Sequence, residues 1–362
     1  MFIEKRKRSF RVLLKSFIIT TVSVCGVILI GRAAFNRAVV PPPIPQAAPL
    51  IQVVRAENPN RNIDHSVDDY DEILEEIWPM PERFTNDDRR EKFWTFLVIG
   101  LNEGTNANTI MVASYDGVNR EANLISIPRD VPINVNRRGR KISSSYIVGA
   151  GGDRGRAGGV TQMQVDVMSI IGFVPDFYVV LDYDAFFTII DAVGGVEIYV
   201  PFHMRYNDPY QDLFIDIPPG LQQMDSETAL HFARFRQANR GSGFQSITDF
   251  GRIENQQIVV NAVIESLLSP ASLLRIPEFV IIFNESVYTN LTFQEMMWFA
   301  LELNHVRSTD ALSSYTMPIS HSSRAPMWYE LLYVNGTIEL INNTINPFDR
   351  DIEVGDTNIA RQ

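Results

Sequence analysis

Short apolar runs alternate with amphipathic stretches across the middle of this chain, and this alternation restricts the fold more than any other feature. The run FWTFLVIGL at Phe93–Leu101 is rich in aromatic and β-branched residues, as is typical of a buried strand. The pattern continues with predicted strands at Thr109–Asp116 and Ala122–Asp130, a helix at Val160–Gly172, a strand at Phe177–Tyr183, a helix at Asp184–Val193 and a strand at Gly194–Pro201. Strands that alternate with helices predict a layered α/β domain.

The composition supports a folded domain and excludes several kinds of site. Apolar residues make up 45% of the chain and charged residues 21%, which is the balance of a globular core. Cys25 is the only cysteine, so neither a disulfide nor a cysteine metal site forms within one chain, and the five histidines are too scattered for a histidine metal site. The glycines from Gly149 to Gly159 do not satisfy the dinucleotide-binding motif, because Arg154 stands at its last glycine. The Walker A, H-E-x-x-H and G-x-S-x-G motifs are absent from the sequence.

The N-terminus has the features of a membrane anchor. Residues 1–15 hold six basic side chains and one acid, whereas residues 16–31 hold no charge and approach the roughly 20 residues that cross a bilayer as a helix. By the positive-inside rule we predict a cytoplasmic basic tail at 1–15 and a single transmembrane helix at 16–32, with the main domain outside the cell membrane. A cleaved signal peptide, with its small-residue site around GRAAF, is the alternative interpretation.

Residues 33–90 are predicted to be a linker. PPPIP at Pro41–Pro45 favours an extended spacer, because proline lacks a backbone donor and fixes its own φ angle. The acid-rich stretch that follows is predicted to contain one short helix at Asp69–Trp78. The remaining predicted divisions are a main domain at 91–345, with a terminal strand and helix after residue 306 and a turn at Asn335 and Gly336, and a flexible tail at 346–362.

Two arginines stand one residue apart among aromatic rings in the segment FARFR, although the chain has a formal net charge of -11. We predict Ser226 as the N-cap of a short helix that ends near Phe232. If the backbone is extended beyond this point, Arg234 and Arg236 point to one face, because side chains alternate along a strand. Two guanidinium groups on one face favour a shared anion, and their geometry suits a phosphate.

Further basic residues lie in two other segments. SIPRD places Arg129 at a strand end, and RKISSSY supplies Lys141 beside hydroxyl groups. Asp249, Arg252 and Gln256 follow one another at spacings of three and four along one side of a helix predicted to begin near Thr248. The collection predicts a phosphate or pyrophosphate site. The remainder of the domain is acidic, which argues against nucleic-acid binding.

Several segments occur together in an order that matches a known family. They are SIPRD at Ser126–Asp130, KI at Lys141 and Ile142, GGV at Gly194–Val196 preceded by Asp191, SETAL followed by RFR, and DFGRIENQQ at Asp249–Gln257. In this combination the chain resembles the LytR-CpsA-Psr family, whose members attach cell-wall glycopolymers to peptidoglycan. The resemblance covers about residues 93–305 and includes the position of the predicted anchor.

The resemblance implies a three-layer α/β/α domain with a mixed central sheet, in which an apolar tunnel holds a polyprenyl chain and basic residues hold its phosphates. The implied site residues are Arg129, Arg234 and Arg236 as catalytic groups, Lys141, Asp249, Arg252 and Gln256 at the pyrophosphate, and Phe232 in the tunnel wall. The implied reaction transfers a glycan phosphate from an undecaprenyl carrier in the membrane bilayer to a sugar hydroxyl of peptidoglycan, with Mg²⁺ assisting. No nucleotide or nucleic acid takes part.

The sequence departs from the family pattern at the expected magnesium ligands. The family carries aspartates where this chain has Asn102 and Asn108, and an arginine where it has Asn106. An amide oxygen can bind Mg²⁺ but carries no charge, so we expect a weakened magnesium site. Activity is expected to survive if the pyrophosphate supplies the missing charge, or if Glu103 or Asp130 supplies a carboxylate. The alternative hypothesis is a catalytically impaired homologue that binds polyprenyl phosphate and acts as a scaffold.

Overall fold

The structure, a computed structural model, describes residues 41–44, 88–102, 106–135, 139–210, 213–267, 269, 272, 275–303, 312–323 and 328–360. The predicted tail, anchor and Asp69–Trp78 helix, and nearly all of the predicted linker, lie outside these residues. Within the described part of the chain, no helix has the length and apolar character that crossing a membrane requires.

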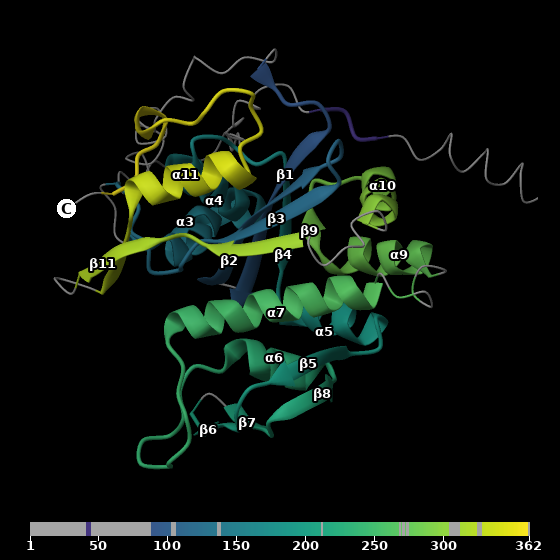
Figure 1. The fold of residues 1–362 in the computed structure, drawn as a ribbon, viewed down its shortest axis with the longest axis vertical. Coiled ribbons are helices and arrows are strands. Elements are labelled where there is room, and N and C mark those ends of the chain that lie inside the picture. The colour runs from purple at the N-terminus through teal and green to yellow at the C-terminus, as the bar shows by residue number, and fades with distance from the viewer. Residues whose placement is uncertain are drawn as a thin grey trace, which may run out of the picture.

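Six strands form one mixed sheet at the centre of the protein, in the order β10-β3-β2-β1-β4-β9 (Figure 1). They are β1 (Phe93–Asn102), β2 (Asn106–Asp116), β3 (Glu121–Ser126), β4 (Phe177–Leu181), β9 (Tyr288–Thr289) and β10 (Leu312–Thr316). β1 is parallel to β4 and β3 is parallel to β10, whereas the other neighbours are antiparallel. The predicted α/β class and mixed central sheet are therefore confirmed.

Helices lie on both faces of this sheet. The alternating side chains of β1 mark the two faces, because Leu97 and Ile99 belong to the main hydrophobic core whereas Phe96 and Val98 line a cavity on the other side. The core face is covered by α3 (Ser145–Ala150), α4 (Gly155–Ile171) and α11 (Val334–Thr344). The cavity face is covered by α5 (Tyr183–Ala192), α7 (Asp249–Leu267), α9 (Ile276–Ser286) and α10 (Phe293–Leu303).

The glycine-rich stretch from Gly149 to Gly159 lets α3 and α4 touch. A Cβ atom on Gly149 would lie 2.3 Å from the carbonyl oxygen of Gly158, and one on Gly158 would lie 2.5 Å from the carbonyl oxygen of Gly149. Only glycine fits at such a close approach. α4 begins at Gly155, before the predicted start at Val160. Its glycines therefore lie inside the helix, where they allow its first turns to pack closely on α3. Short 3₁₀ helices occur beside them at Ile142–Ser144 and Gly152–Arg154.

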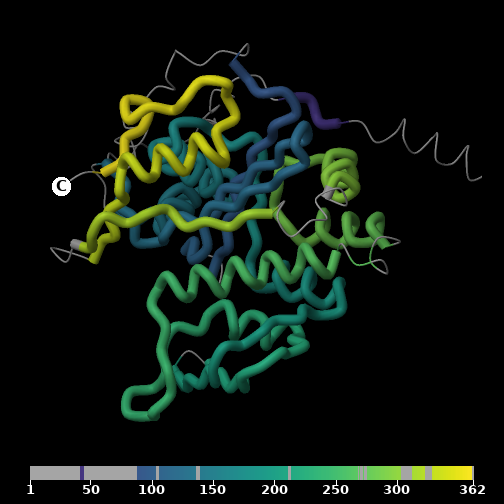
Figure 2. The backbone as a smooth tube through the Cα atoms, viewed as in Figure 1, coloured from purple at the N-terminus to yellow at the C-terminus, as the bar shows by residue number. Residues whose placement is uncertain are grey.

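A smaller unit, called here the lower lobe, lies below α7 in Figures 1 and 2. It consists of β5 (Val196–Val200) paired with β8 (Gly220–Met224), β6 (Met204–Asp208) paired with β7 (Leu213–Ile217), and α6 (Ser226–Arg234). β5 alternates buried and exposed residues, and its buried side chains pack against α6 and α7. The predicted strand at Gly194–Pro201 is thus present as β5, but it belongs to this lobe and not to the central sheet.

The C-terminal part packs on the core face of the domain. β11 (Ile319–Ser323) and β12 (Tyr329–Leu332) form a two-stranded sheet, α11 follows, and a 3₁₀ helix spans Val354–Asp356. The predicted flexible tail at 346–362 is wrong for residues 346–360, because Phe348, Ile352 and Ile359 are buried in the main core. The predicted turn at Asn335 and Gly336 is also wrong, since both residues lie in the first turn of α11.

Candidate functional site

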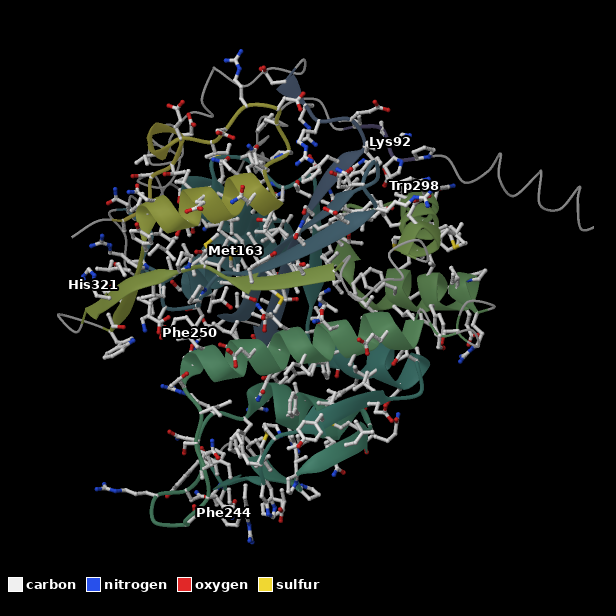
Figure 3. All side chains as sticks on the ribbon, in the orientation of Figure 1. Lys92, Met163, Phe244, Phe250, Trp298 and His321 are labelled. Atoms are coloured by element: carbon white, nitrogen blue, oxygen red, sulfur yellow. The ribbon has the colours of Figure 1, made fainter. Side chains whose placement is uncertain are left out.

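Three arginines from separate segments surround one carboxylate at the first residue of α7. Asp249 Oδ1 lies 2.8 Å from a nitrogen of Arg252, 3.7 Å from one of Arg129 and 3.7 Å from one of Arg236. Arg252 also donates a hydrogen bond to Asp249 Oδ2 at 2.9 Å. Figure 3 labels Phe250, the next residue along, at the end of α7 that lies beneath the central sheet. The predicted helix start near Thr248 and the predicted proximity of Asp249 and Arg252 agree with this geometry.

The cations of this group are only partly satisfied by Asp249. The side chains of Arg252 and Asp249 are 10% and 11% exposed, so their attraction is less screened than that of a surface pair. However, Asp249 Oδ1 makes no well-directed hydrogen bond within the described structure, and the Nε atoms of Arg129 and Arg252 are also buried without a partner. Buried donors without acceptors are costly. Burial lowers the pKa of Arg252 to about 10, and the group still remains charged at neutral pH.

A second ion pair joins the same group. Lys141 Nζ lies 2.7 Å from Asp130 Oδ1, and Asp130 directly follows Arg129 in the loop after β3. β3 ends at Ser126, earlier than the predicted end at Asp130, and Pro128 follows before the two charged residues. We refer to Arg129, Asp130, Lys141, Arg236, Asp249 and Arg252 as the charged cluster.

A buried carboxyl group that the sequence analysis missed also belongs beside the charged cluster. Glu330 lies in β12, is only 5% exposed, and donates its backbone N–H to the carbonyl oxygen of Asp130 at 3.1 Å. Burial raises the pKa of Glu330, and the nearby charges of Asp249 and Asp130 raise it further. The signal in the sequence was a single glutamate in the otherwise apolar strand YELL. Asp130, whose carbonyl oxygen accepts the Glu330 N–H, is 200 residues earlier in the chain, so only the fold shows that the two residues lie together.

Two of the predicted site residues, Arg234 and Phe232, lie outside the charged cluster. α6 is capped by Asp225, whose side chain accepts from the backbone N–H of Thr228, and it continues to Arg234. Arg234 and Arg236 therefore do not alternate along a strand. The guanidinium carbon of Arg234 lies 5.5 Å from the centroid of the Tyr183 ring, away from the contacts of Asp249.

Phe232 does not line the cavity. Its side chain is completely buried in the hydrophobic cluster of the lower lobe, and Phe235 is buried in the same cluster. The rings of FARFR stabilise the lobe that carries α6, and its second arginine reaches the charged cluster. The expectation that Phe232 walls an apolar tunnel is thus replaced by a role in packing.

Gln256 is half-buried on α7, one turn after Arg252, whereas its neighbour Gln257 fixes the helix to the sheet. The side-chain amide of Gln257 donates to Ser126 Oγ at 2.8 Å and to the carbonyl oxygen of Tyr315 at 2.7 Å. These bonds join α7 to the ends of β3 and β10. The start of α7 is consequently held at a fixed position relative to the loop that carries Arg129.

The described residues do not fit a magnesium ion held by acidic side chains. Asn102 Oδ1 accepts the backbone N–H of Asn106 at 2.9 Å, and Asn108 Oδ1 accepts a hydrogen bond from Arg129 at 3.2 Å. The carboxylate of Asp130 is paired with Lys141. Nowhere in the described ranges do three acidic, histidine or cysteine side chains come close enough to hold a metal. Glu103 lies outside those ranges, and we assign no metal ligand to the others.

An apolar cavity of about 380 Å³ lies between the central sheet and the helices of the cavity face. α7 contributes to both the cavity and the charged cluster, because Val260 and Ile264 line the cavity whereas Arg252 holds Asp249. At 1.5 Å per residue, Arg252 and Val260 are about 12 Å apart along the helix axis. A ligand with a phosphate head and an apolar chain matches this separation between the charged cluster and the apolar cavity.

These features define the protein as a mixed α/β domain in which one helix joins a cationic group to an apolar cavity. The LytR_cpsA_psr family matches residues 81–343, and the chain belongs to this family. The expected family resemblance is thereby confirmed.

Two curated relatives show how far the similarity extends. The polyisoprenyl-teichoic acid–peptidoglycan teichoic acid transferase TagV of Bacillus subtilis (strain 168) is 26% identical over 215 residues, 58% of this chain and 52% of TagV. The regulatory protein MsrR of Staphylococcus aureus (strain COL) is 25% identical over 235 residues, 63% of this chain and 65% of MsrR. This chain therefore spans between half and two thirds of the length of these relatives.

Solved structures share the fold. The crystal structure of B. subtilis TagV has a TM-score of 0.56 at 22% identity, covering 70% of this chain and 96% of that one. The structure of TagT bound to LIIa-WTA has a TM-score of 0.55 at 18% identity, covering 70% of this chain and 89% of that one. At these identities the comparison establishes the architecture alone.

Proposed function

We propose that this protein is a membrane-anchored phosphotransferase that moves a glycopolymer phosphate from a polyprenyl-pyrophosphate carrier to peptidoglycan during cell-wall assembly. The observation that carries the proposal is the double role of α7, which holds Arg252 in the charged cluster and lines the apolar cavity with Val260 and Ile264. The proposal places the basic tail in the cytoplasm, the anchor in the bilayer and the domain outside the cell membrane. Membership of the family, and the transferase named among its relatives, support it.

The charged cluster supplies what phosphoryl transfer asks of a protein. Negative charge spreads over the phosphoryl oxygens in the transition state, and fixed cations stabilise it. Arg129, Arg236 and Arg252 already surround one anionic oxygen, and the unpaired Nε groups of Arg129 and Arg252 offer further donors. In this proposal the phosphate oxygens take the place that Asp249 partly fills, and Lys141 adds a fourth positive charge.

A second candidate function has a specific observation behind it. Asn102 and Asn108 are neutral, and their side-chain oxygens already accept hydrogen bonds from a backbone N–H and from Arg129. A protein with these groups and an intact charged cluster binds polyprenyl phosphate without transferring anything. It would then act as a scaffold at the wall.

One experiment separates the two candidates. The full chain, purified in lipid nanodiscs, is given a glycan linked to polyprenyl pyrophosphate and peptidoglycan fragments, with and without Mg²⁺. Binding of the lipid and release of polyprenyl phosphate are both measured. We expect binding together with release that requires the acceptor. Binding without release under either condition supports the scaffold, and the absence of binding contradicts both functions.

A further inference from the structure

Glu330 is a buried acid with an unused oxygen. It lies in β12 with 5% of its surface exposed, and its Oε2 atom is buried without a hydrogen-bond partner in the described part of the chain. A buried carboxyl group without a partner costs free energy, which burial alone does not repay. The fold tolerates this cost at Glu330, which indicates that the carboxyl group has a role other than packing.

The neighbours of Glu330 place it at the charged cluster. Its backbone N–H bonds the carbonyl oxygen of Asp130, and its carboxyl group interacts electrostatically with Asp249, Asp130, Arg129 and Lys141. The two acids of the cluster are each held in an ion pair, Asp130 by Lys141 and Asp249 by Arg252, although Asp249 Oδ1 also lacks a well-directed hydrogen bond. Among the described acids at this site, Glu330 is the one that forms no ion pair and leaves a carboxylate oxygen without a hydrogen bond.

The transfer reaction needs a group of this kind. A sugar hydroxyl attacks phosphorus more readily when a positioned side chain removes its proton, and this contributes typically 10²–10⁴-fold to the rate. Asn102 and Asn108 cannot take a proton at neutral pH, since a side-chain amide is not basic.

We propose that Glu330 is the catalytic base that accepts the proton of the attacking hydroxyl group. The inference rests on the proposed transfer function. The hydroxyl oxygen forms a new bond to the phosphorus of the glycan phosphate, and its proton moves to the Glu330 carboxylate. The bond from that phosphorus to the bridging oxygen breaks, and its electron pair leaves on the polyprenyl phosphate. The proton then passes from Glu330 to solvent.

The electrostatic surroundings of Glu330 suit this role. Burial is the main cause that raises the pKa of Glu330. The charges of Asp249 and Asp130 raise this pKa further, whereas those of Arg129 and Lys141 lower it. A raised pKa makes the carboxylate a stronger base than an exposed glutamate. Since a base must be deprotonated to act, kcat/KM should rise with pH through the pKa of Glu330 and then level off.

The test uses Glu330→Gln in the full chain, because glutamine keeps the size of the side chain and removes its basicity. Transfer from the lipid-linked glycan is measured as a function of pH, beside binding of polyprenyl phosphate and the unfolding midpoint. Glu339→Gln is the matched control, since this exposed residue on α11 receives the same chemical change outside the site. Glu330→Asp keeps a carboxylate but shortens its reach.

We expect Glu330→Gln to lower kcat by at least about 100-fold and to lose the acidic limb of the pH profile. Lipid binding should stay close to that of the unmodified protein, and Glu339→Gln should behave normally. If Glu330→Gln transfers within about threefold of the unmodified rate, the inference is overturned while the proposed function stands. If the unmodified chain binds lipid but transfers nothing, the proposed function fails and the inference fails with it.

Should Glu330→Gln not fold, Glu330→Asp decides the question. A lowered rate with the acidic limb retained supports Glu330 as the base. An unchanged rate for the shortened side chain contradicts it, because proton transfer depends on reach.

Discussion

The two ends of α7 face opposite chemical environments. Its first turn carries the buried pair Asp249 and Arg252 within the charged cluster, whereas its later turns place Val260 and Ile264 in the wall of an apolar cavity. The two halves belong to one rigid element, so their separation is fixed by the helix itself. In the proposed function, this one helix would hold the charged head of an amphipathic lipid at one end and its apolar chain at the other.

The charged end should give the largest effect when it is broken. Arg252→Ala removes the guanidinium that lies 2.8 Å from Asp249, and we expect pyrophosphate and polyprenyl pyrophosphate to bind about 100-fold more weakly. Calorimetric titration of both ligands measures this. Arg205→Ala, in the lower lobe, is the control, because its half-exposed guanidinium contacts Phe244 and not the cluster. Equal losses in both variants would show a general charge effect and not a site.

The apolar end should respond to only one of these ligands. Val260→Asn places an amide in the cavity wall, and an unpaired amide there costs about 1–3 kcal/mol. We expect polyprenyl pyrophosphate to bind about tenfold more weakly while inorganic pyrophosphate binds as before. Ile258→Asn, at an exposed position of the same helix, should change neither affinity. A parallel loss of both ligands in Val260→Asn would mean that the two ends do not act separately.

Replacing Asn102 and Asn108 by aspartate tests whether the charged end of α7 can lie beside a metal site. The double change Asn102→Asp and Asn108→Asp adds two negative charges, one of them beside Arg129, which now donates a hydrogen bond to the Asn108 amide oxygen. We expect Mg²⁺ to bind at least about tenfold more tightly, measured by titration with the metal alone. The double variant Asn102→Ala and Asn108→Ala serves as the comparison. No gain in affinity would show that these positions do not face a shared metal.

The smallest expected effect concerns stability and pH. The pKa of Glu330 is raised above its usual 4.5 in the folded protein, so folding favours the protonated form. Its contribution to stability is fully present below the usual value and is lost as pH rises through the raised value. The unfolding midpoint of Glu330→Gln should therefore match the unmodified protein at acidic pH and exceed it at alkaline pH. A gap that narrows with rising pH would contradict the direction of the shift.

The local patterns predicted most of the central sheet. Aromatic and β-branched runs marked β1, β2 and β4 within a few residues, because buried strands are written almost entirely by such side chains. The helical spacing after Thr248 likewise gave α7 and the pairing of Asp249 with Arg252, since residues three apart on a helix are neighbours.

Errors arose where one local pattern fitted two structures. The helix was predicted to end near Phe232, and extended backbone after it would have placed Arg234 and Arg236 on one face, but α6 continues through Arg234 because its apolar side chains match the helical period. The final residues looked polar and loose, yet Phe348 and Ile352 anchor them in the core. Glu330 could not be predicted as a site residue for a different reason. It lies beside Asp130 in the fold but far from it in the sequence, and no local sequence pattern shows such a contact.

The carboxylate of Asp249 already neutralises part of the charge of the arginines around it. In the proposed function, an incoming anion would have to displace this resident counter-ion. A monovalent anion such as chloride would gain little from that exchange, whereas a multiply charged one would leave the arginines better neutralised than before. A site built in this way would select its ligands by their charge.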